Sequence, residues 1–397
     1  MSTFDLHTAL CDAAREEGFP AAGALDLDLA REQFAPHLDR YDDWLDRGQD
    51  ATMTYLRRGR DRRADPRQVF PEAQSILCVA QPYPARAAGQ TNPRQGPRYA
   101  RYLRRLDYHE EISARLERVM VRVASQQAAI YANAGPSGGA SGTAGPTLRW
   151  KTCVDHRAVL ERSWAALAGL GWIGKNTLLI HPQLGSYLFL GEVLINQPTG
   201  HGPRPLPDYC GRCTRCLVAC PSRALEERRL DANRCISYWT LEKRGELGLT
   251  EPDRRAVGGW IAGCDLCQEV CPFNTKATRA DLTALTAGAP GPDGGAIQVD
   301  RWPELLRETE AEYRARTRHS ALSRVKPAQF RRNLALTLAN AIAETGAGAW
   351  TDPLRPLIAE HLRVETDTGA RAEWQRCLNL LGDQRVSSGD PFSSRDE

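Results

Sequence analysis

The sequence predicts an α+β protein, and three observations carry this prediction. Helix-like and strand-like patterns alternate up to about residue 198, which is typical of α/β or α+β domains. A cysteine-rich segment follows at 208–275, and the region beyond it has the apolar spacing of helices. Stretches rich in proline and glycine, at 198–207 and 287–295, separate the three parts.

The first part contains recognisable elements. Residues 6–14 have the pattern of an amphipathic helix and 75–80 that of a buried strand. Apolar residues recur at helical spacing through 107–131, and Asp107 can cap the start of this long helix. Residues 57–67 (RRGRDRRADPR) are basic and polar, which predicts a solvated loop.

Further elements lie closer to the cysteines. Residues 152–155 end a strand, 159–168 form a helix, and 186–195 form an apolar strand that also contains Gly191 and Glu192. Two helical stretches in the C-terminal region predict stacked pairs, at 332–343 and 353–362. The Gly/Ser/Pro-rich insert 134–146 predicts a flexible surface loop, and the tail from residue 387 is expected to fray.

The bulk composition is that of a soluble globular protein. Hydrophobic residues make up 42% of the 397 residues and charged residues 25%, with a formal net charge of +3. No run of 18 apolar residues exists and no signal sequence is recognisable, so we expect a cytoplasmic protein with no membrane contact. Most of the 52 basic residues are arginine, which suits phosphate recognition but also follows from a GC-rich genome.

Eight of the twelve cysteines form a metal-binding pattern. Cys210, Cys213, Cys216 and Cys220-Pro221 have the spacing C-x2-C-x2-C-x3-C-P of bacterial ferredoxins. In that motif three thiolates bind one 4Fe–4S cluster, and the fourth binds the other cluster. A second set of ligands must therefore exist.

The second set is present in altered form. Cys264, Cys267 and Cys271-Pro272 repeat the last three motif positions, but the first position holds Ile261. Cys235 is the nearby cysteine that can supply the missing ligand. We assign Cys210, Cys213, Cys216 and Cys271 to one cluster and Cys220, Cys235, Cys264 and Cys267 to the other.

One alternative to this assignment remains open. Two zinc sites of four cysteines each would also use eight thiolates, although zinc ribbons carry well-separated pairs. The other four cysteines lie in apolar or helical patterns and are expected to be small buried side chains: Cys11, Cys78, Cys153 and Cys377. The clusters need an acceptor, for which a flavin or a corrin held before residue 200 are both candidates.

Several blocks over about 300 residues resemble the epoxyqueuosine reductase family, which is cobalamin-dependent and modifies tRNA. The blocks are Arg101-Tyr102 with Asp107-Tyr108-His109, Val154-Asp155 with Leu160-Glu161-Arg162, Ala168-Gly-Leu-Gly-Trp172 with Gly174-Lys175, Gly185-Ser186 with Leu190-Gly191-Glu192, the cysteine run, Arg234-Cys-Ile-Ser-Tyr238 with Thr240 and Glu242, Gly263-Cys-Asp with Cys267-Gln268, and Asn333. The ordered set is specific, although each block alone is weak.

The resemblance implies four regions and one reaction. Residues 1–200 would be an α/β cobalamin-binding catalytic domain, 201–285 a ferredoxin-like domain with two 4Fe–4S clusters, 286–386 HEAT-like helical repeats that contact tRNA, and 387–397 a flexible tail. The clusters would pass electrons to base-off cobalamin. The enzyme would then reduce epoxyqueuosine to queuosine in tRNA, the last step of queuosine biosynthesis.

The resemblance also implies roles for single residues. Asp155 matches the proton donor and a cofactor contact, and its alternative role is a helix cap before Val159. Arg63, Leu179 and Ser237 match cobalamin contacts. Four further positions carry weaker expectations: Lys175 as a phosphate contact or a solvated lysine, Tyr102 and His109 as pocket or structural residues, and Leu103 in place of a cysteine found in some relatives.

The implied partners are a tRNA with epoxyqueuosine in its anticodon loop and an external electron donor of the flavodoxin or ferredoxin type, acting on a monomer. Basic residues near the C-terminal helices are candidates for phosphate contacts or an ordinary polar face: Arg314, Arg316, Arg318, Arg324, Lys326, Arg331 and Arg332. Two other hypotheses remain open. A reductive dehalogenase also couples a corrin to two clusters, and a non-catalytic electron carrier needs only the clusters.

Overall fold

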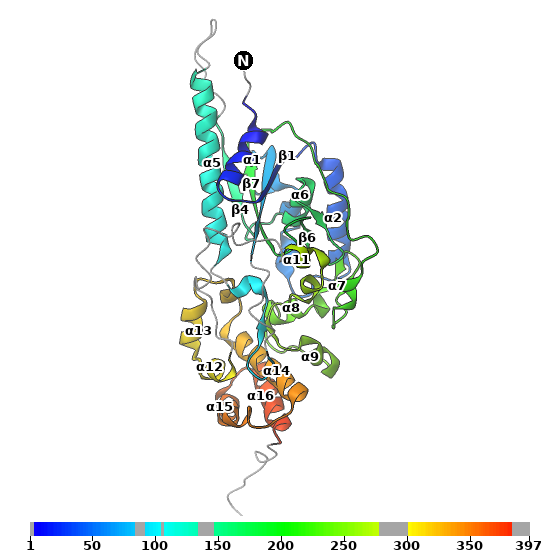
Figure 1. The fold of residues 1–397 in the computed structure, drawn as a ribbon, viewed down its shortest axis with the longest axis vertical. Helices are drawn as coiled ribbons and strands as arrows, with labels where there is room; N and C mark the ends of the chain where they lie inside the picture. Colours follow the sequence, from blue (N-terminus) through cyan, green and yellow to red (C-terminus); the bar gives the residue numbers. More distant parts are fainter. Residues whose placement is uncertain (1–3, 84–91, 105–106, 134–146, 278–300, 383–397) are drawn as a thin grey trace, which may run out of the picture. The chain divides into compact units, whose positions relative to one another are not determined.

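The computed structural model describes residues 4–83, 92–104, 107–133, 147–277 and 301–382 (Figure 1). The chain divides into two units. The first unit comprises Met1–Arg86, Arg105–Cys235 and Asp265–Gly295, and the second comprises Ala87–Arg104, Ile236–Cys264 and Ala296–Glu397. The predicted flexible insert 134–146, the spacer 287–295 and the tail 387–397 lie outside the described residues.

A four-stranded sheet lies at the centre of the first unit. Its order is β1 (Ala21–Asp26), β2 (Ser75–Pro82), β7 (Leu188–Ile195) and β4 (Trp150–Cys153), and every neighbouring pair is antiparallel. The predicted α+β class is confirmed as a mixed fold. The narrower expectation of an α/β domain is wrong, because helices between strands do not fix strand direction and an α/β sheet would be mostly parallel.

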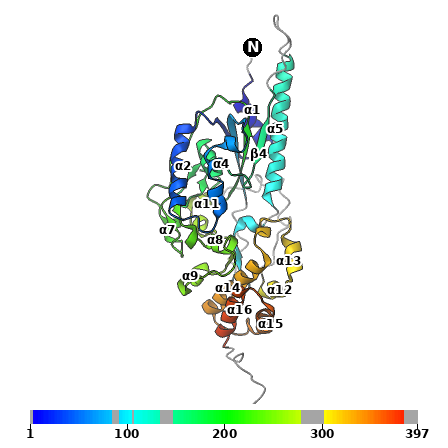
Figure 2. The same cartoon turned by 180° about the vertical axis from the view of Figure 1, so that it is seen from behind.

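Helices cover both faces of this sheet, as both views show (Figures 1 and 2). On one face lie α1 (Leu6–Glu16) and α5 (Tyr108–Asn133), and on the other lies α6 (Glu161–Leu167), backed by α2 (Arg31–Asp46). A Cβ added at Gly191 of β7 would lie 2.8 Å from Ile112 on α5. Glycine therefore allows α5 to approach the middle of the sheet.

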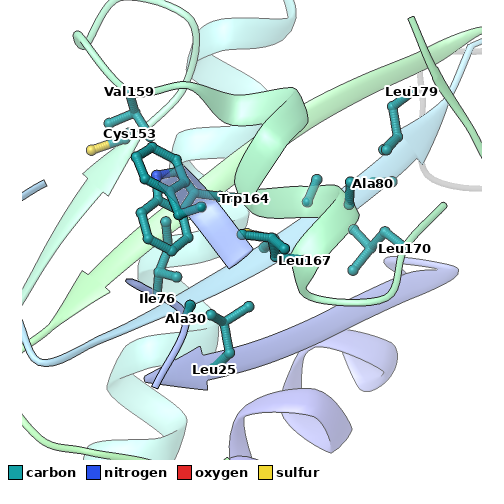
Figure 3. Close-up of a cluster of buried hydrophobic side chains, with 14 of the residues drawn as sticks. Leu25, Ala30, Ile76, Ala80, Cys153, Val159, Trp164, Leu167, Leu170 and Leu179 are labelled. Carbon is teal, nitrogen blue, oxygen red and sulfur yellow. The ribbon is translucent and has the colours of Figure 1, made fainter. Parts of the chain in front are cut away.

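The hydrophobic core fills the space between the sheet and α6 (Figure 3). Trp164 of α6 stacks on Phe34 of α2, with ring centroids 4.3 Å apart. Cys153 and Val159, on either side of the connection from β4 to α6, point into the same core. Both ends of this short connection are therefore anchored, which limits the positions that its middle residues can take.

Most local predictions for the first unit are confirmed. The expected helices appear as α1, α5 and α6, and the expected strands as β2, β4 and β7. Asp107 caps α5, since its Oδ1 accepts the N–H of His109 at 3.0 Å. The polar loop predicted at 57–67 is wrong. This stretch contains the end of α3 (Thr54–Arg58), α4 (Arg60–Ala64) and the start of η1 (Pro66–Gln68).

The cysteine-rich part of the first unit consists of short elements. They are the pair β5 (Trp172–Ile173) and β6 (Leu179–Ile180), α7 (Arg215–Val218), the pair β8 (Leu225–Glu226) and β9 (Arg229–Leu230), η3 (Ala232–Arg234), α10 (Leu266–Glu269) and α11 (Pro272–Ala277). Helices α7 and α10 each follow one cysteine turn, and they pack against each other.

The second unit is mainly helical. Its elements are β3 (Arg98–Tyr99), η2 (Arg101–Arg104), α8 (Ile236–Leu241), α9 (Glu251–Val257), β10 (Trp260–Ala262), α12 (Trp302–Arg307), α13 (Glu310–Thr317), η4 (Ala321–Arg324), α14 (Pro327–Thr345), η5 (Asp352–Leu354), α15 (Arg355–Val364) and α16 (Thr368–Leu380). Helices α14 and α16 pack side by side, and α15 packs on α16 (Figure 1). Within the described ranges, no helix has both the length and the apolarity needed to cross a bilayer.

Candidate active site

Asp155 lies in the connection between β4 and α6, at the end of the sheet. The neighbouring Val154 is fully buried, whereas 46% of the Asp155 side chain is exposed. Its backbone has a φ of +52°, a left-handed conformation that costs a non-glycine residue roughly 1 kcal/mol. Residues held in such conformations concentrate at functional sites. The connection therefore presents one carboxyl group to solvent in a fixed, strained geometry.

Two side chains from the start of α5 contact the Asp155 carboxylate. The Tyr108 hydroxyl donates to Oδ2 at 3.2 Å, and His109 Nε2 lies 3.2 Å from the same oxygen. Tyr108 is itself held by stacking on Phe189 of β7, with centroids 3.9 Å apart and planes 12° apart. Asp155 therefore meets two donors that the helix and the sheet position together.

His109 bridges two carboxylates. Its Nδ1 contacts Oδ1 of Asp107, and its Nε2 contacts Asp155. Burial lowers the pKa of His109, but the hydrogen bonds with Asp155 and Asp107 outweigh it and raise this pKa above its ordinary value. The charged imidazolium is favoured, and it can donate from both nitrogens.

Two glutamates lie behind Asp155. Oε1 of Glu161, the first residue of α6, accepts the backbone N–H of Asp155 at 2.6 Å. Glu192 of β7 is fully buried. Burial, followed by the charge of Asp155, raises the pKa of Glu161 to about 7, and burial also raises the pKa of Glu192 well above its ordinary value. The predicted helix-cap role of Asp155 is wrong, because Leu160 occupies the cap position of α6.

The sequence prediction assigned no role to either glutamate. The available signal was Glu192 itself, a carboxylate within an otherwise apolar strand, where only a hydrogen-bonded or neutral acid is tolerated. The same reasoning overlooked Tyr108, whose block Asp107-Tyr108-His109 was recognised only as part of the resemblance.

The candidate cobalamin contacts lie in both units. Arg63 is on α4 and Leu179 on β6, both in the first unit, whereas Ser237 is on α8 in the second. Leu179 packs in the same core as Val159, which follows Asp155 by four residues. Leu179 and the Asp155 connection thus belong to the same unit, whereas Ser237 belongs to the other.

Arg63 has the feature expected of a residue that binds an absent polar group. Its Nη1 is buried and has no hydrogen-bond partner within the described part of the chain. A Cβ at Gly59 would lie 2.2 Å from this nitrogen, so glycine leaves the space that the guanidinium occupies. The buried Nδ2 of Asn176, three residues before Leu179, likewise lacks a partner among the described residues. These N–H groups fit the amide and phosphate oxygens at the edge of cobalamin.

Four cysteines of the predicted first cluster lie close enough to affect one another. Burial raises the pKa of the Cys216 thiol, and Cys210 and Cys271 raise it further. Burial also raises the pKa of Cys271, with added contributions from Cys210 and Cys213. Trp172 Nε1 donates to Cys210 Sγ at 3.4 Å. This group fits a cluster, which needs four thiolates and is tuned by N–H donors to sulfur.

The cysteines of the predicted second group are divided between the two units. Cys220, Cys235 and Cys267 lie in the first unit, and Cys264 belongs to the second. Backbone contacts hold Cys220, whose Sγ accepts the N–H of Ala224 at 3.3 Å. No three His, Cys, Asp or Glu side chains of the described residues surround a single metal-ion position. A cubane does not require this, because each thiolate binds a different iron, whereas zinc needs four ligands around one ion.

A buried polar network ties the cysteine segment to the sheet. Asn274, three residues after Cys271, accepts the N–H of Ser186 at 2.6 Å and donates to the Ser186 hydroxyl at 2.9 Å. Gly185 has a φ of +74°, and a Cβ there would lie 2.2 Å from Asn274 Oδ1. Glycine is therefore required where the cysteine segment meets the strand that carries Glu192.

One predicted phosphate contact, Arg332, is structural instead. Arg332 is fully buried and donates to the carbonyl oxygens of Trp239, Lys243 and Gly245, so its predicted role is wrong. Four more arginines pair with glutamates: Arg314 with Glu310, Arg316 with Glu308, Arg324 with Glu242 and Arg331 with Glu365. Arg318 and Lys326 are exposed.

Lys175 is neither a solvated lysine nor an available phosphate contact. It is buried, and its Nζ lies 3.5 Å from Glu227 Oε2. Tyr102 and Leu103 lie in η2 of the second unit, where Leu103 is buried. The expectation for the four remaining cysteines is confirmed, since all are buried: Cys11, Cys78, Cys153 and Cys377.

Comparisons with known proteins agree with this geometry. The family described as "4Fe-4S double cluster binding domain" matches residues 209–274, and the chain is an iron–sulfur oxidoreductase. The family described as "Epoxyqueuosine reductase QueG, DUF1730" matches residues 63–134. An epoxyqueuosine reductase of Synechococcus sp. (strain CC9605) is 35% identical over 342 residues, covering 83% of this chain and 94% of the relative. The chain belongs to the epoxyqueuosine reductase family.

Solved structures of epoxyqueuosine reductases share the fold. The enzyme of Bacillus subtilis, described with an aspartate-bearing catalytic loop swung out of the active site, superposes with a TM-score of 0.67 at 24% identity. A second structure, in complex with a tRNA-Tyr epoxyqueuosine-modified stem loop, has a TM-score of 0.63 at 23% identity. Both similarities cover 94% of this chain and 98% of the other.

Proposed function

We propose that this protein reduces epoxyqueuosine to queuosine in tRNA, with Asp155 as the proton donor. The observation that carries the proposal is the exposed, strained carboxyl of Asp155, contacted by Tyr108 and His109, in a chain of the epoxyqueuosine reductase family. The reaction takes up two electrons and two protons. Both carbon–oxygen bonds of the epoxide break, an alkene forms, and the oxygen leaves as water.

Asp155 supplies the proton that the departing oxygen needs. Expelling an unprotonated alkoxide is difficult, and a positioned acid accelerates such a step by a factor of about 10²–10⁴. The imidazolium of His109 contacts Asp155 Oδ2 and can return a proton to it after each turnover. Tyr108 orients the same oxygen. The three side chains form a short path for protons toward the exposed carboxyl.

The proposed cofactors are base-off cobalamin and two 4Fe–4S clusters. Cobalamin, when bound, supplies a strong two-electron reductant for the epoxide. Arg63 and Asn176 would hold its polar edge, and Leu179 and Ser237 complete the proposed contacts. One cluster would use Cys210, Cys213, Cys216 and Cys271, and the other Cys220, Cys235, Cys264 and Cys267. The two clusters would carry electrons one at a time from an external flavodoxin or ferredoxin.

The substrate is a tRNA that carries epoxyqueuosine in its anticodon loop. The structural relative solved with an epoxyqueuosine-modified tRNA stem loop supports this partner. We infer that residues 1–200 form the catalytic domain, 201–285 the cluster domain and 286–386 a HEAT-like repeat that contacts tRNA, as a monomer in the cytoplasm. Within the repeat, Arg318 and Lys326 are exposed candidates for phosphate contacts.

Deletion of the gene tests the proposal in the cell. In a host without a second enzyme of this activity, tRNA from the deletion strain should contain epoxyqueuosine in place of queuosine. The wild-type gene should restore queuosine, and an Asp155→Asn gene should not. Normal queuosine in the deletion strain would contradict the proposed function.

A further inference from the structure

A buried carboxyl pair lies behind the strained Asp155 connection. Glu192 occupies the central strand β7, directly between Cys78 of β2 and Cys153 of β4. Cross-strand partners share a face of the sheet, so this carboxyl faces α6 together with two buried thiols. Neither carboxyl oxygen of Glu192 accepts a hydrogen bond from any donor among the described residues.

The environment of Glu192 decides its charge. An ionised carboxylate without donors in an apolar interior is strongly unfavourable, so the group stays neutral. The adjacent thiols do not compensate, since burial raises the pKa of Cys78 and Cys153, the latter to about 12. A neutral Glu192 carries its own proton, and after burial the charge of Glu161 is the next cause that raises the pKa of Glu192.

Glu161 connects this proton to the active site. Glu161 begins α6, which packs on β7, and its charge helps to raise the pKa of Glu192. The Oε1 of Glu161 accepts the backbone N–H of Asp155 at 2.6 Å. That N–H belongs to the residue with a φ of +52°, a conformation the chain does not adopt without support. Two carboxyls that share a site hold one proton between them over a wide pH range, because both cannot ionise together.

We propose that Glu161 and Glu192 share one proton and act as positioning residues that hold the Asp155 connection in its productive conformation. The shared proton keeps Glu161 in place as the acceptor of the Asp155 amide. The Asp155 carboxyl then faces Tyr108 and His109. This inference rests on the proposed role of Asp155 in catalysis.

Loss of the shared proton should release the connection. Two adjacent buried carboxylates repel, and Glu161 would then turn toward solvent and abandon the Asp155 amide. The charged and titratable groups around the pair are Asp155, His109 and Arg162 near Glu161, and Asp155, Cys78 and Cys153 near Glu192. Of these, Arg162 and His109 favour an ionised Glu161, whereas Asp155 favours the protonated form of both glutamates.

Replacing Glu192 by glutamine distinguishes this arrangement from a merely structural carboxylate. A glutamine amide donates to Glu161 as the neutral acid does, but it cannot ionise. We therefore expect Glu192→Gln to keep single-turnover rates within about threefold of wild type. In Glu192→Gln, the part of the alkaline decline in rate that is caused by ionisation of the Glu161–Glu192 pair should disappear. Glu161→Ala removes the acceptor and should reduce the rate by about 10²-fold, with unchanged affinity for the tRNA stem loop.

Hydrogen exchange and infrared spectra test the pair without reference to activity. In full-length protein, Glu161→Ala should accelerate amide exchange in residues 154–160 by about tenfold, corresponding to one charged hydrogen bond. Glu192→Gln should leave that exchange unchanged and remove the infrared band of a buried protonated carboxyl. The exposed Glu32→Gln on α2 serves as the control and should change neither.

The same measurements can overturn the inference. Equal protection of residues 154–160 in wild type and Glu161→Ala would do so, as would loss of that protection in Glu192→Gln. If Glu161→Ala does not fold, wild type and Glu192→Gln still decide the question. After correction for the intrinsic rate of amide exchange, the protection of residues 154–160 should fall at alkaline pH in wild type but not in Glu192→Gln. If wild type has no reductase activity, the proposed function fails while these tests remain valid.

Discussion

His109 Nε2 lies 3.2 Å from Oδ2 of Asp155, although 46 residues separate the two in the chain. The contact joins the first turn of α5 to the connection that follows β4. Asp107 contacts the other ring nitrogen. Asp155, which would give up a proton in each turnover, thus lies beside the imidazole of His109, which favours its protonated form. Four predictions follow from the site, and each has its own measurement.

Asp155→Asn should abolish most of the turnover. The amide cannot donate a proton of comparable acidity, and we expect a single-turnover rate lower by about 10²–10⁴-fold. Iron content and tRNA affinity should stay at wild-type values, because asparagine has nearly the same shape as aspartate and the side chain is half-exposed. Rapid-quench assays with analysis of the tRNA nucleosides measure the rate. Wild-type turnover in this variant would remove Asp155 from the mechanism.

The charge on His109 should make part of the stability depend on pH. The folded pKa lies above the ordinary 6.5, so the stabilising contribution is complete below pH 6.5 and is lost as pH rises through the folded pKa. His109→Gln should therefore lower the free energy of unfolding, measured by denaturant titration, more at about pH 6 than at pH 9, by roughly 1 kcal/mol for this partly exposed site. A pKa at or below 6.5 in an NMR titration would contradict the bridge.

Trp172→Phe should make one cluster harder to reduce. The indole N–H donates to Cys210 Sγ, and such donors stabilise the more negative, reduced state. Loss of roughly 1 kcal/mol corresponds to a midpoint potential about 40 mV more negative for a one-electron couple. Redox titration followed by EPR measures this. The matched control is Trp44→Phe, which loses the hydrogen bond from Trp44 Nε1 to the Leu230 carbonyl oxygen and should leave the potential unchanged.

Cys235→Ser should remove one cluster and leave the other. The assignment gives Cys235 the ligand position that Ile261 leaves vacant in the second motif. Iron should fall from about eight to about four atoms per chain after anaerobic reconstitution. Cys11→Ala, a buried cysteine of α1 outside both motifs, should retain the full content. Full iron content in Cys235→Ser would show that another group completes the cluster.

The sequence made some parts of this structure predictable and not others. Apolar periodicity located α1, β2, α5 and β7, because each buries a continuous face or strand. It could not determine strand direction, which depends on how the long connections return to the sheet. The stretch 57–67 was misjudged because its charge suggested solvation. Arg57 and Arg60 instead pair with Asp50 and Asp42, so the charged residues pack locally.

Some residues of the candidate site were also predictable from the sequence, and others were not. Spacing indicated seven of the predicted cluster ligands, because a cluster requires thiolates in a short, fixed pattern, and elimination added Cys235. Glu161 and Glu192 could not be found in that way, since their proximity depends on how α6 packs on β7. Arg332 was assigned to tRNA on charge alone, yet three backbone carbonyls occupy its guanidinium. Charge in a sequence does not reveal whether a side chain is already satisfied.

The central claim is the reduction of an epoxide in tRNA. Protein reconstituted anaerobically with iron, sulfide and cobalamin should be incubated with a chemically reduced electron donor and an epoxyqueuosine-containing anticodon stem loop. Mass spectrometry of the digested RNA should then show queuosine, lighter than the substrate by one oxygen atom, with no product from the Asp155→Asn protein. Unchanged epoxyqueuosine, from protein in which both clusters and cobalamin are present and reduced, would contradict the account.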